Sequence, residues 1–197
     1  VCLVGKSNEY HVINALKVSL EENLTNIKNS IEHLKYLGRE PIFDAEHFFD
    51  GFKLNPDYAL ETLHTAQSSG ARWIVLCDTN GGTLPDEVYR ITETVIKKGI
   101  RRLNLGIHTH NDTGNAIANS LAAVNAGIRH VQGTLNGLGE RCGNADLITL
   151  IPTLILKEPY CDTVELSVSK TELPLLTRTS RLLDDLLNRV PSRGAPY

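Results

Sequence analysis

The feature that most constrains the fold of this chain is a regular alternation of apolar, strand-like runs with amphipathic helical segments. The predicted strands begin near residues 1, 41, 73, 103 and 130, at intervals of 40, 32, 30 and 27 residues. This spacing leaves room for one crossover helix after each strand, so it predicts parallel strands joined by helices. Two architectures fit such a repeat: an open, doubly wound sheet and part of an eight-stranded βα barrel.

The polar residues at the strand ends distinguish between these two architectures. Each of the last four predicted strands ends in polar side chains, namely Asp44 and Glu46, Asp78 and Thr79, His108 and His110, and Thr134 and Asn136. In a barrel the C-terminal ends of all strands converge on one site, whereas an open sheet concentrates function at one switch point. The pattern therefore predicts an α/β fold of the (β/α)8 TIM-barrel type, of which this chain contains about five units.

Composition excludes several classes of protein. The net charge is -3 and the basic residues form no long run, so nucleic-acid binding is not expected. No apolar segment reaches the roughly 20 residues that a membrane-spanning helix needs, and no signal peptide is recognisable. The four cysteines show no Cys-x-x-Cys spacing, which favours reduced thiols over a disulfide framework. We expect a cytoplasmic protein.

A histidine pair within residues 103–144 is the most specific chemical feature. His108 and His110 end a predicted strand and, being two residues apart, should point to the same face of the sheet. Asn111 and Asp112 follow at once, so the pair could hold a metal ion with polar support around it. Two hydrogen-bonded histidines at a polar strand end are the simpler interpretation when the pair is considered alone.

A glycine-rich loop precedes Asn144 and allows the backbone to turn sharply close to a ligand. Its glycines are Gly133, Gly137, Gly139 and Gly143. Because the loop lies between a predicted strand and a helix, with Glu165 roughly 20 residues further on, a dinucleotide-binding fingerprint is an alternative. The glycine spacing is one residue too long, and the loop follows the fifth unit instead of opening the fold, which disfavours that alternative.

These motifs resemble a known family of enzymes. The sequences I-H-T-H-N-D-x-G-x-A-x-A-N-S-L-A-A-V-x-A-G and G-T-x-N-G-x-G-E-R-C-G-N are similar to signatures of the α-isopropylmalate, homocitrate and citramalate synthases. The sequence L-C-D-T-N-G-G-T-L-P resembles the sixth barrel strand of that family, and P-I-F-D-A-E-H-F-F-D-G-F resembles its citramalate synthase branch. The resemblance implies that residues 1–160 form strands 4 to 8 of a TIM barrel. Residues 161–197 would then form a helical linker toward an accessory subdomain.

The resemblance also implies an activity. Members of the family are metal-dependent acyltransferases that condense acetyl-CoA with a 2-oxo acid, and the citramalate branch uses pyruvate. Such an enzyme would serve isoleucine or leucine biosynthesis, bind these two small molecules, and form a homodimer. The alternatives are an isopropylmalate or homocitrate synthase, a related acyl-CoA lyase, and, outside this class, a non-catalytic nucleotide-binding α/β module.

The resemblance assigns roles to individual residues. His108, His110 and Asn144 match positions that bind the divalent metal, which could be Mn²⁺, Mg²⁺, Zn²⁺ or Co²⁺. Thr79 matches the threonine that hydrogen-bonds the carboxylate of the 2-oxo acid. Glu46 matches a catalytic glutamate beside the reacting centre, where it also contacts substrate. The acyl-CoA would enter past four loop residues, Gly137, Gly139, Glu140 and Arg141.

Other polar residues are expected to play supporting roles. Asp112 would orient a metal-binding side chain, while His47 and His130 would be hydrogen-bonded structural histidines. The family's Arg-Asp pair on its first strand and its later His-Lys pair have no counterpart in these 197 residues. We therefore expect the chain alone to be inactive.

Overall fold

The computed structural model describes residues 1–197, which divide into two compact units, Val1–Gln132 and Gly133–Tyr197. The first unit contains the predicted strands and the helices between them. The second contains the glycine-rich loop and the C-terminal helices. The sequence predicts a division near residue 160, where the barrel segment is expected to end and the linker to begin. This boundary differs in kind from the division into compact units, and it stays a prediction.

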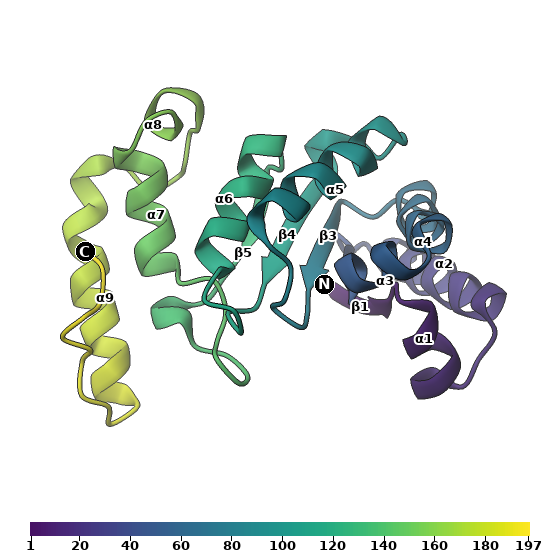
Figure 1. Cartoon of the computed structure of the whole chain (residues 1–197), viewed down its shortest axis with the longest axis horizontal. Coiled ribbons are helices and arrows are strands. Elements are labelled where there is room, and N and C mark those ends of the chain that lie inside the picture. Colours follow the sequence, from purple (N-terminus) through teal and green to yellow (C-terminus); the bar gives the residue numbers. More distant parts are fainter. The chain divides into compact units, whose positions relative to one another are not determined.

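The first unit is built on a parallel sheet of five strands (Figure 1). The strands are β1 (Cys2–Lys6), β2 (Ile42–Glu46), β3 (Trp73–Asp78), β4 (Leu105–Thr109) and β5 (His130–Gln132). Each strand lies beside its predecessor, in the order β1-β2-β3-β4-β5. A doubly wound sheet would reverse its order at a switch point, and no reversal occurs here. The predicted α/β alternation is confirmed, and the progressive strand order is that of a barrel wall.

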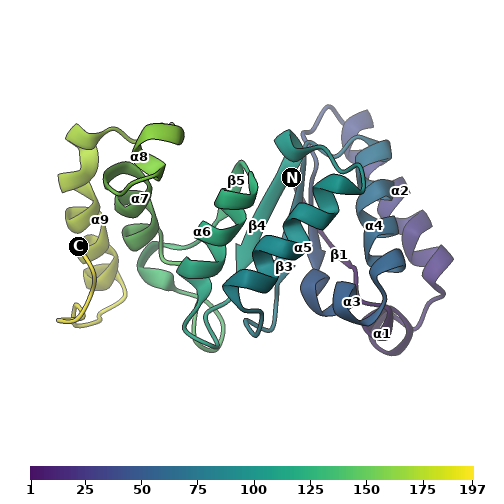
Figure 2. The ribbon, with the colours of Figure 1, turned by 45° about the horizontal axis from the view of Figure 1, so that its top comes forward.

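Helices connect the successive strands, and Figure 2 shows α4, α5 and α6 on the same side of the sheet. The four long helices are α2 (Leu20–Tyr36), α4 (Pro56–Ser69), α5 (Pro85–Lys97) and α6 (Ala116–Ala126). Ser19 caps the N-terminus of α2, because its hydroxyl accepts a hydrogen bond of 3.0 Å from the backbone amide of Glu22. Several short elements were not predicted: α1 (Glu9–His11), the π-helical turn η1 (Val12–Leu16), α3 (Phe48–Leu54) and the 3-10 turn η2 (Arg102–Asn104).

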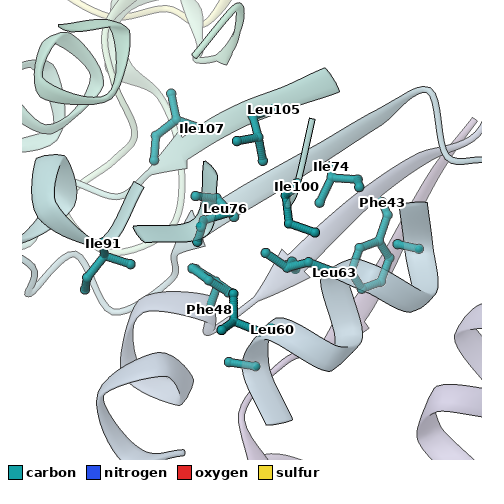
Figure 3. Packing of buried hydrophobic residues seen from close by; sticks show 14 of the residues in the cluster. Phe43, Phe48, Leu60, Leu63, Ile74, Leu76, Ile91, Ile100, Leu105 and Ile107 are labelled. Atoms are coloured by element: carbon teal, nitrogen blue, oxygen red, sulfur yellow. The ribbon is translucent and has the colours of Figure 1, made fainter. Parts of the chain in front are cut away.

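The two faces of the sheet differ in polarity. The face toward the helices is apolar and mostly buried, and Figure 3 shows its strand residues packed on helix residues such as Leu63 and Ile91. Side chains alternate along a strand, so the intervening residues lie on the opposite face. That face carries polar side chains toward the C-terminal ends of the strands, where the register pairs Lys6 with Glu46, and His108 with both Cys77 and Gln132. Parallel strands are usually apolar on both faces, so a polar face indicates a site.

The second unit is mainly helical. The loop turn η3 (Leu135–Gly137) leads to α7 (Leu147–Leu156) and α8 (Tyr160–Thr163), and the 3-10 turn η4 (Lys170–Glu172) leads to α9 (Leu173–Leu186). Helix α9 ends just before Asn188, whose backbone is left-handed with φ of 53°. None of the helices in either unit is both long enough and apolar enough to span a membrane.

Candidate active site

His108 and His110 lie close together at the C-terminal end of β4. Their ring centres are 5.1 Å apart, with 46° between the ring planes. Two imidazoles that bind one ion through nitrogens at about 2.1 Å have ring centres about 5 Å apart, so this spacing fits a shared metal ion. The backbone amide of His110 donates a 3.3 Å hydrogen bond to the Asp78 carbonyl, which holds the strand end against β3.

Two imidazoles are an incomplete set of metal ligands. Over residues 1–197, no three or more His, Cys, Asp or Glu side chains are grouped so that they could hold a metal ion. The donor chemistry of the histidine pair nevertheless fits a divalent ion whose remaining ligands are amide, substrate or water oxygens. Asn144 would offer an amide oxygen, and it belongs to the second unit.

The ends of β2 and β3 bring Glu46 and Thr79 into the same region of the first unit. The Glu46 carboxylate forms an ion pair with Lys6 on the neighbouring strand β1. The Thr79 hydroxyl oxygen accepts a 2.8 Å hydrogen bond from the backbone amide of His47, so it ties the end of β2 to the end of β3. His47 itself has a left-handed backbone, with φ of 56°. Such strain in a residue other than glycine is common at functional sites.

The expectation that His130 is a hydrogen-bonded structural histidine is wrong for its buried Nε2, whereas His47 is held by an ion pair with Asp50 and by a backbone hydrogen bond to Thr79. Neither His47 Nδ1 nor His130 Nε2 has a hydrogen-bond partner. Both rings are also stacked on another ring: His47 lies on His11 with ring centres 3.9 Å apart, and His130 lies on Trp73 at 4.8 Å. Sequence spacing could not show this, because each partner ring comes from a distant segment.

These rings affect the charges around them. The His47 imidazole, whose Nδ1 is 3.6 Å from Asp50 Oδ2, is the main cause that lowers the pKa of the Asp50 carboxyl. Burial lowers the pKa of His130, because the charged imidazolium loses hydration. The lowered pKa keeps Asp50, which follows β2, in its carboxylate form. The lowered pKa of His130 favours its neutral imidazole.

A buried hydrogen-bond network braces the loops that carry the site. The Asp78 carboxylate accepts hydrogen bonds from Thr83 Oγ1 at 2.8 Å and from Asn119 Nδ2 at 3.3 Å. Asn119 also donates to the Thr83 carbonyl at 2.8 Å. Burial raises the pKa of Asp78. These three residues lie within the motifs that carry the family resemblance, so part of each motif is architectural.

The glycine-rich loop is shaped to pack against Asn144. A Cβ atom on Gly139 would overlap the Asn144 side-chain oxygen, and a Cβ on Gly143 would overlap the Gly137 carbonyl. Gly143 also has a left-handed φ of 90°. The backbone amide of Asn144 donates to the Gly137 carbonyl at 3.0 Å, and Asn144 is 7% exposed. The glycines are therefore required to enclose Asn144, which the sequence pattern alone did not indicate.

The structure disfavours the dinucleotide interpretation of this loop. A phosphate would bind at the N-terminus of the helix that follows, where backbone amides are unpaired. In α7 this position is occupied by the Asp146 carboxylate, which accepts hydrogen bonds from the Ile148 amide at 3.0 Å and the Thr149 hydroxyl at 2.9 Å. A negatively charged cap there repels a phosphate.

Gln132 is a polar residue of the site that sequence reasoning missed. Its side-chain oxygen lies 2.7 Å from His108 Nδ1, and its Nε2 donates to the Asp44 carboxylate at 2.9 Å. The available signal was period-two alternation, which places Gln132, Thr134 and Asn136 on one face of the fifth predicted strand. Gln132 lies two residues before Thr134, so it is not among the polar residues that end the predicted strand.

Comparison with known proteins agrees with the fold and the motifs. The HMGL-like family matches residues 1–181. The (R)-citramalate synthases of Synechocystis sp. and Aquifex aeolicus are 52% and 50% identical to the chain, and each match covers 100% of the chain and 36% of the relative. The HMG-CoA lyase of Bacillus subtilis has the same fold, with a TM-score of 0.81 and 19% identity over 98% of this chain and 65% of that one. The chain thus spans 36% of the length of these synthases. We conclude that it belongs to the HMGL-like family.

Proposed function

We propose that this chain is part of a metal-dependent synthase that condenses acetyl-CoA with a 2-oxo acid, with pyruvate as the acceptor and citramalate as the product. The observation that carries the proposal is the histidine pair at the end of β4, with ring centres 5.1 Å apart. Identity of about half over the whole chain with (R)-citramalate synthases supports the choice of reaction and substrate.

The fold supports a matching structural proposal. The five strands would be strands 4 to 8 of a (β/α)8 barrel, with residues 1–160 forming the C-terminal part of the barrel and residues 161–197 forming a linker toward an accessory subdomain. Progressive strand order and a polar face opposite the helices are what such a wall requires. A homodimer and a cytoplasmic location remain expectations from the resemblance.

His108, His110 and Asn144 would bind the metal ion, which could be Mn²⁺, Mg²⁺, Zn²⁺ or Co²⁺. When bound, a divalent ion would polarise the keto carbonyl of the 2-oxo acid and stabilise the negative charge that develops on its oxygen. The two imidazoles supply neutral nitrogen ligands from a rigid strand end, and the enclosed amide of Asn144 supplies an oxygen.

Thr79 and Glu46 would position the substrates. The Thr79 hydroxyl oxygen accepts a hydrogen bond from the backbone amide of His47, and the hydroxyl would donate to the carboxylate of the 2-oxo acid when the substrate binds. The ion pair with Lys6 fixes the Glu46 carboxylate at the end of β2. There it would contact the substrate during proton transfer at the acetyl group.

The reaction itself has three chemical stages. A base removes a proton from the methyl group of acetyl-CoA, and the resulting carbanion attacks the keto carbon of the acceptor to form a carbon-carbon bond. Hydrolysis of the thioester then releases the thiol of coenzyme A and makes the condensation effectively irreversible. Gly137, Gly139, Glu140 and Arg141 would border the path of the acyl-CoA. Arg141 suits this role, because guanidinium groups pair well with phosphates.

Release of free thiol from acetyl-CoA tests the proposal, using the full-length product of the gene. We expect release with pyruvate that stops when a chelator removes divalent metal. His108→Asn and His110→Asn should each lower the rate by at least about 100-fold, since loss of supporting residues alone costs 10 to 100-fold. His33→Asn, an exposed histidine on α2, is the matched control and should leave the rate unchanged.

Two results would change the assignment in different ways. Thiol release with a larger 2-oxo acid but not with pyruvate would correct the substrate and keep the reaction class. Thiol release that is indifferent to chelator, or absent with every 2-oxo acid, would contradict the proposed reaction.

A further inference from the structure

We infer that Asp44, acting through the side-chain amide of Gln132, holds His108 in the tautomer that carries its proton on Nδ1. The lone pair is thereby left on Nε2. This inference rests on the proposed function only in taking Nε2 as the atom that binds metal, because the tautomer itself is a property of the metal-free protein.

The three residues come from three strands of the polar face. Asp44 lies on β2 and is 8% exposed, His108 lies on β4 and Gln132 on β5. Gln132 pairs directly with His108 in the strand register, but β2 and β5 are separated by β3 and β4. The Gln132 amide therefore reaches across the polar face to a residue 88 positions away in the sequence. Figure 1 labels β4 and β5, which carry His108 and Gln132.

The direction of the hydrogen bonds follows from the chemistry of the three groups. A carboxylate has only acceptor oxygens, so the Gln132 group 2.9 Å from Asp44 Oδ1 must be the NH2 that donates. The amide oxygen then faces His108 Nδ1 at 2.7 Å. Because an amide oxygen can only accept, Nδ1 must carry the hydrogen. A neutral imidazole has one N–H, so Nε2 is left with its lone pair.

Asp44 is the group that fixes the orientation of the Gln132 side-chain amide. Without it, the Gln132 amide could rotate by 180° and present its NH2 to His108, which would favour the opposite tautomer. With Asp44 in place, that rotation would set the amide oxygen against a carboxylate oxygen, and both are acceptors. Asp44 is thus a positioning residue for His108, although their side chains are linked only through Gln132.

The hydrogen bond from His108 to Gln132 would orient the imidazole before a metal ion binds. A histidine that donates its other N–H to a fixed acceptor has a defined ring orientation and a more basic free nitrogen. Loss of such a partner typically lowers metal affinity by about 10 to 100-fold. An unanchored His108 would have to select both its rotamer and its tautomer on binding.

The first test is the ¹⁵N chemical shifts of the His108 ring in the metal-free, full-length product of the gene, in mildly alkaline buffer. We expect the wild type to show Nδ1–H. Asp44→Asn should give a mixture of tautomers, because the amide is no longer held in one orientation. Gln132→Met should also lose the preference. Gln132→Glu should retain Nδ1–H, since a carboxylate can only accept, even though a second carboxylate beside Asp44 should lower stability.

The second readout is the affinity for Mn²⁺, measured by calorimetry. Asp44→Asn and Gln132→Met should each bind about 10 to 100-fold more weakly than wild type. Gln67→Met is the matched control, because the Gln67 amide also makes two hydrogen bonds, to the Gly99 carbonyl at 3.1 Å and from the Arg101 amide at 2.8 Å. These two hydrogen bonds join α4 to the segment before β4 and involve none of the proposed metal ligands. The Gln67→Met variant should therefore bind Mn²⁺ as the wild type does.

Three outcomes would overturn the inference. They are an Nε2–H tautomer in the wild type, an unchanged tautomer in Asp44→Asn, and equal loss of the tautomer in Gln132→Glu and Gln132→Met. The last would indicate a merely structural role. Failure of thiol release with every 2-oxo acid would contradict the proposed reaction and leave the tautomer measurement standing, so the two failures are distinguishable.

Discussion

Asp78→Ala should destabilise the first unit by about 2 kcal/mol, because it removes the acceptor of a buried network. Asp78 is 1% exposed, and Thr83 and Asn119 are fully buried. Loss of the carboxylate strands the Thr83 hydroxyl, at a cost of about 1–3 kcal/mol, and leaves a small cavity that costs about 1 kcal/mol. Asn119 keeps its 2.8 Å hydrogen bond to the Thr83 carbonyl, so its amide adds little. Alanine also removes the cost of burying the Asp78 carboxylate, the same burial that raises its pKa, and this offsets part of the lost free energy of unfolding.

Urea unfolding followed by the fluorescence of Trp73 measures this change. Trp73 is the only tryptophan of the chain and lies on β3, the strand that ends in Asp78. A loss of about 2 kcal/mol corresponds to a shift of about 30-fold in the folding equilibrium. Asp86→Ala is the control, because this carboxylate is exposed in the first turn of α5 and its loss should cost no more than about 1 kcal/mol.

A double-mutant cycle with Thr83→Val isolates the stranded hydroxyl. In the Asp78→Ala background, valine replaces an unsatisfied hydroxyl with a methyl group and should restore about 1 kcal/mol. Strict additivity of the two substitutions, or a loss below about 0.5 kcal/mol for Asp78→Ala, would refute the view that this network supports the loop that carries Thr79.

Three further substitutions test separate parts of the structure. Gly139→Ala should lower Mn²⁺ affinity about tenfold or more, because its Cβ displaces the Asn144 side chain, whereas Gly194→Ala, with open space around it, should not. Burial holds the pKa of His130 below 6.5, so the unfolded chain takes up its proton first, and stability should fall by at most about 1.4 kcal/mol per pH unit as pH drops below 6.5. His130→Phe keeps a ring to stack on Trp73 and should flatten that fall in urea titrations, and an unchanged slope would contradict it. Phe43→Ala should cost about 3–5 kcal/mol by urea unfolding, because Phe43 is fully buried in the core, and a loss under 1 kcal/mol would be inconsistent with that packing.

Secondary structure was predictable because it depends on neighbours in the chain. Apolar runs at regular intervals located all five strands. The short helix α3 was missed, because it begins after the left-handed backbone of His47, and histidine gives no signal for that conformation. Strand order required the three-dimensional fold, since a repeat of βα units fits two different sheet topologies.

The candidate site also combines features that follow from local sequence spacing with contacts that depend on the fold. The proximity of His108 and His110 follows from two-residue spacing on a strand, and that local rule is enough to bring their rings to one face. The partners of those residues depend on strand register and on reach across the sheet. Lys6 meets Glu46 from a strand 40 positions earlier, and Asp44 reaches Gln132 over 88 positions. Local sequence patterns are therefore enough to indicate which residues can carry chemistry and at which strand ends they lie. The groups that hydrogen-bond to these residues follow from the three-dimensional fold, because contacts between distant segments depend on packing that no local pattern encodes.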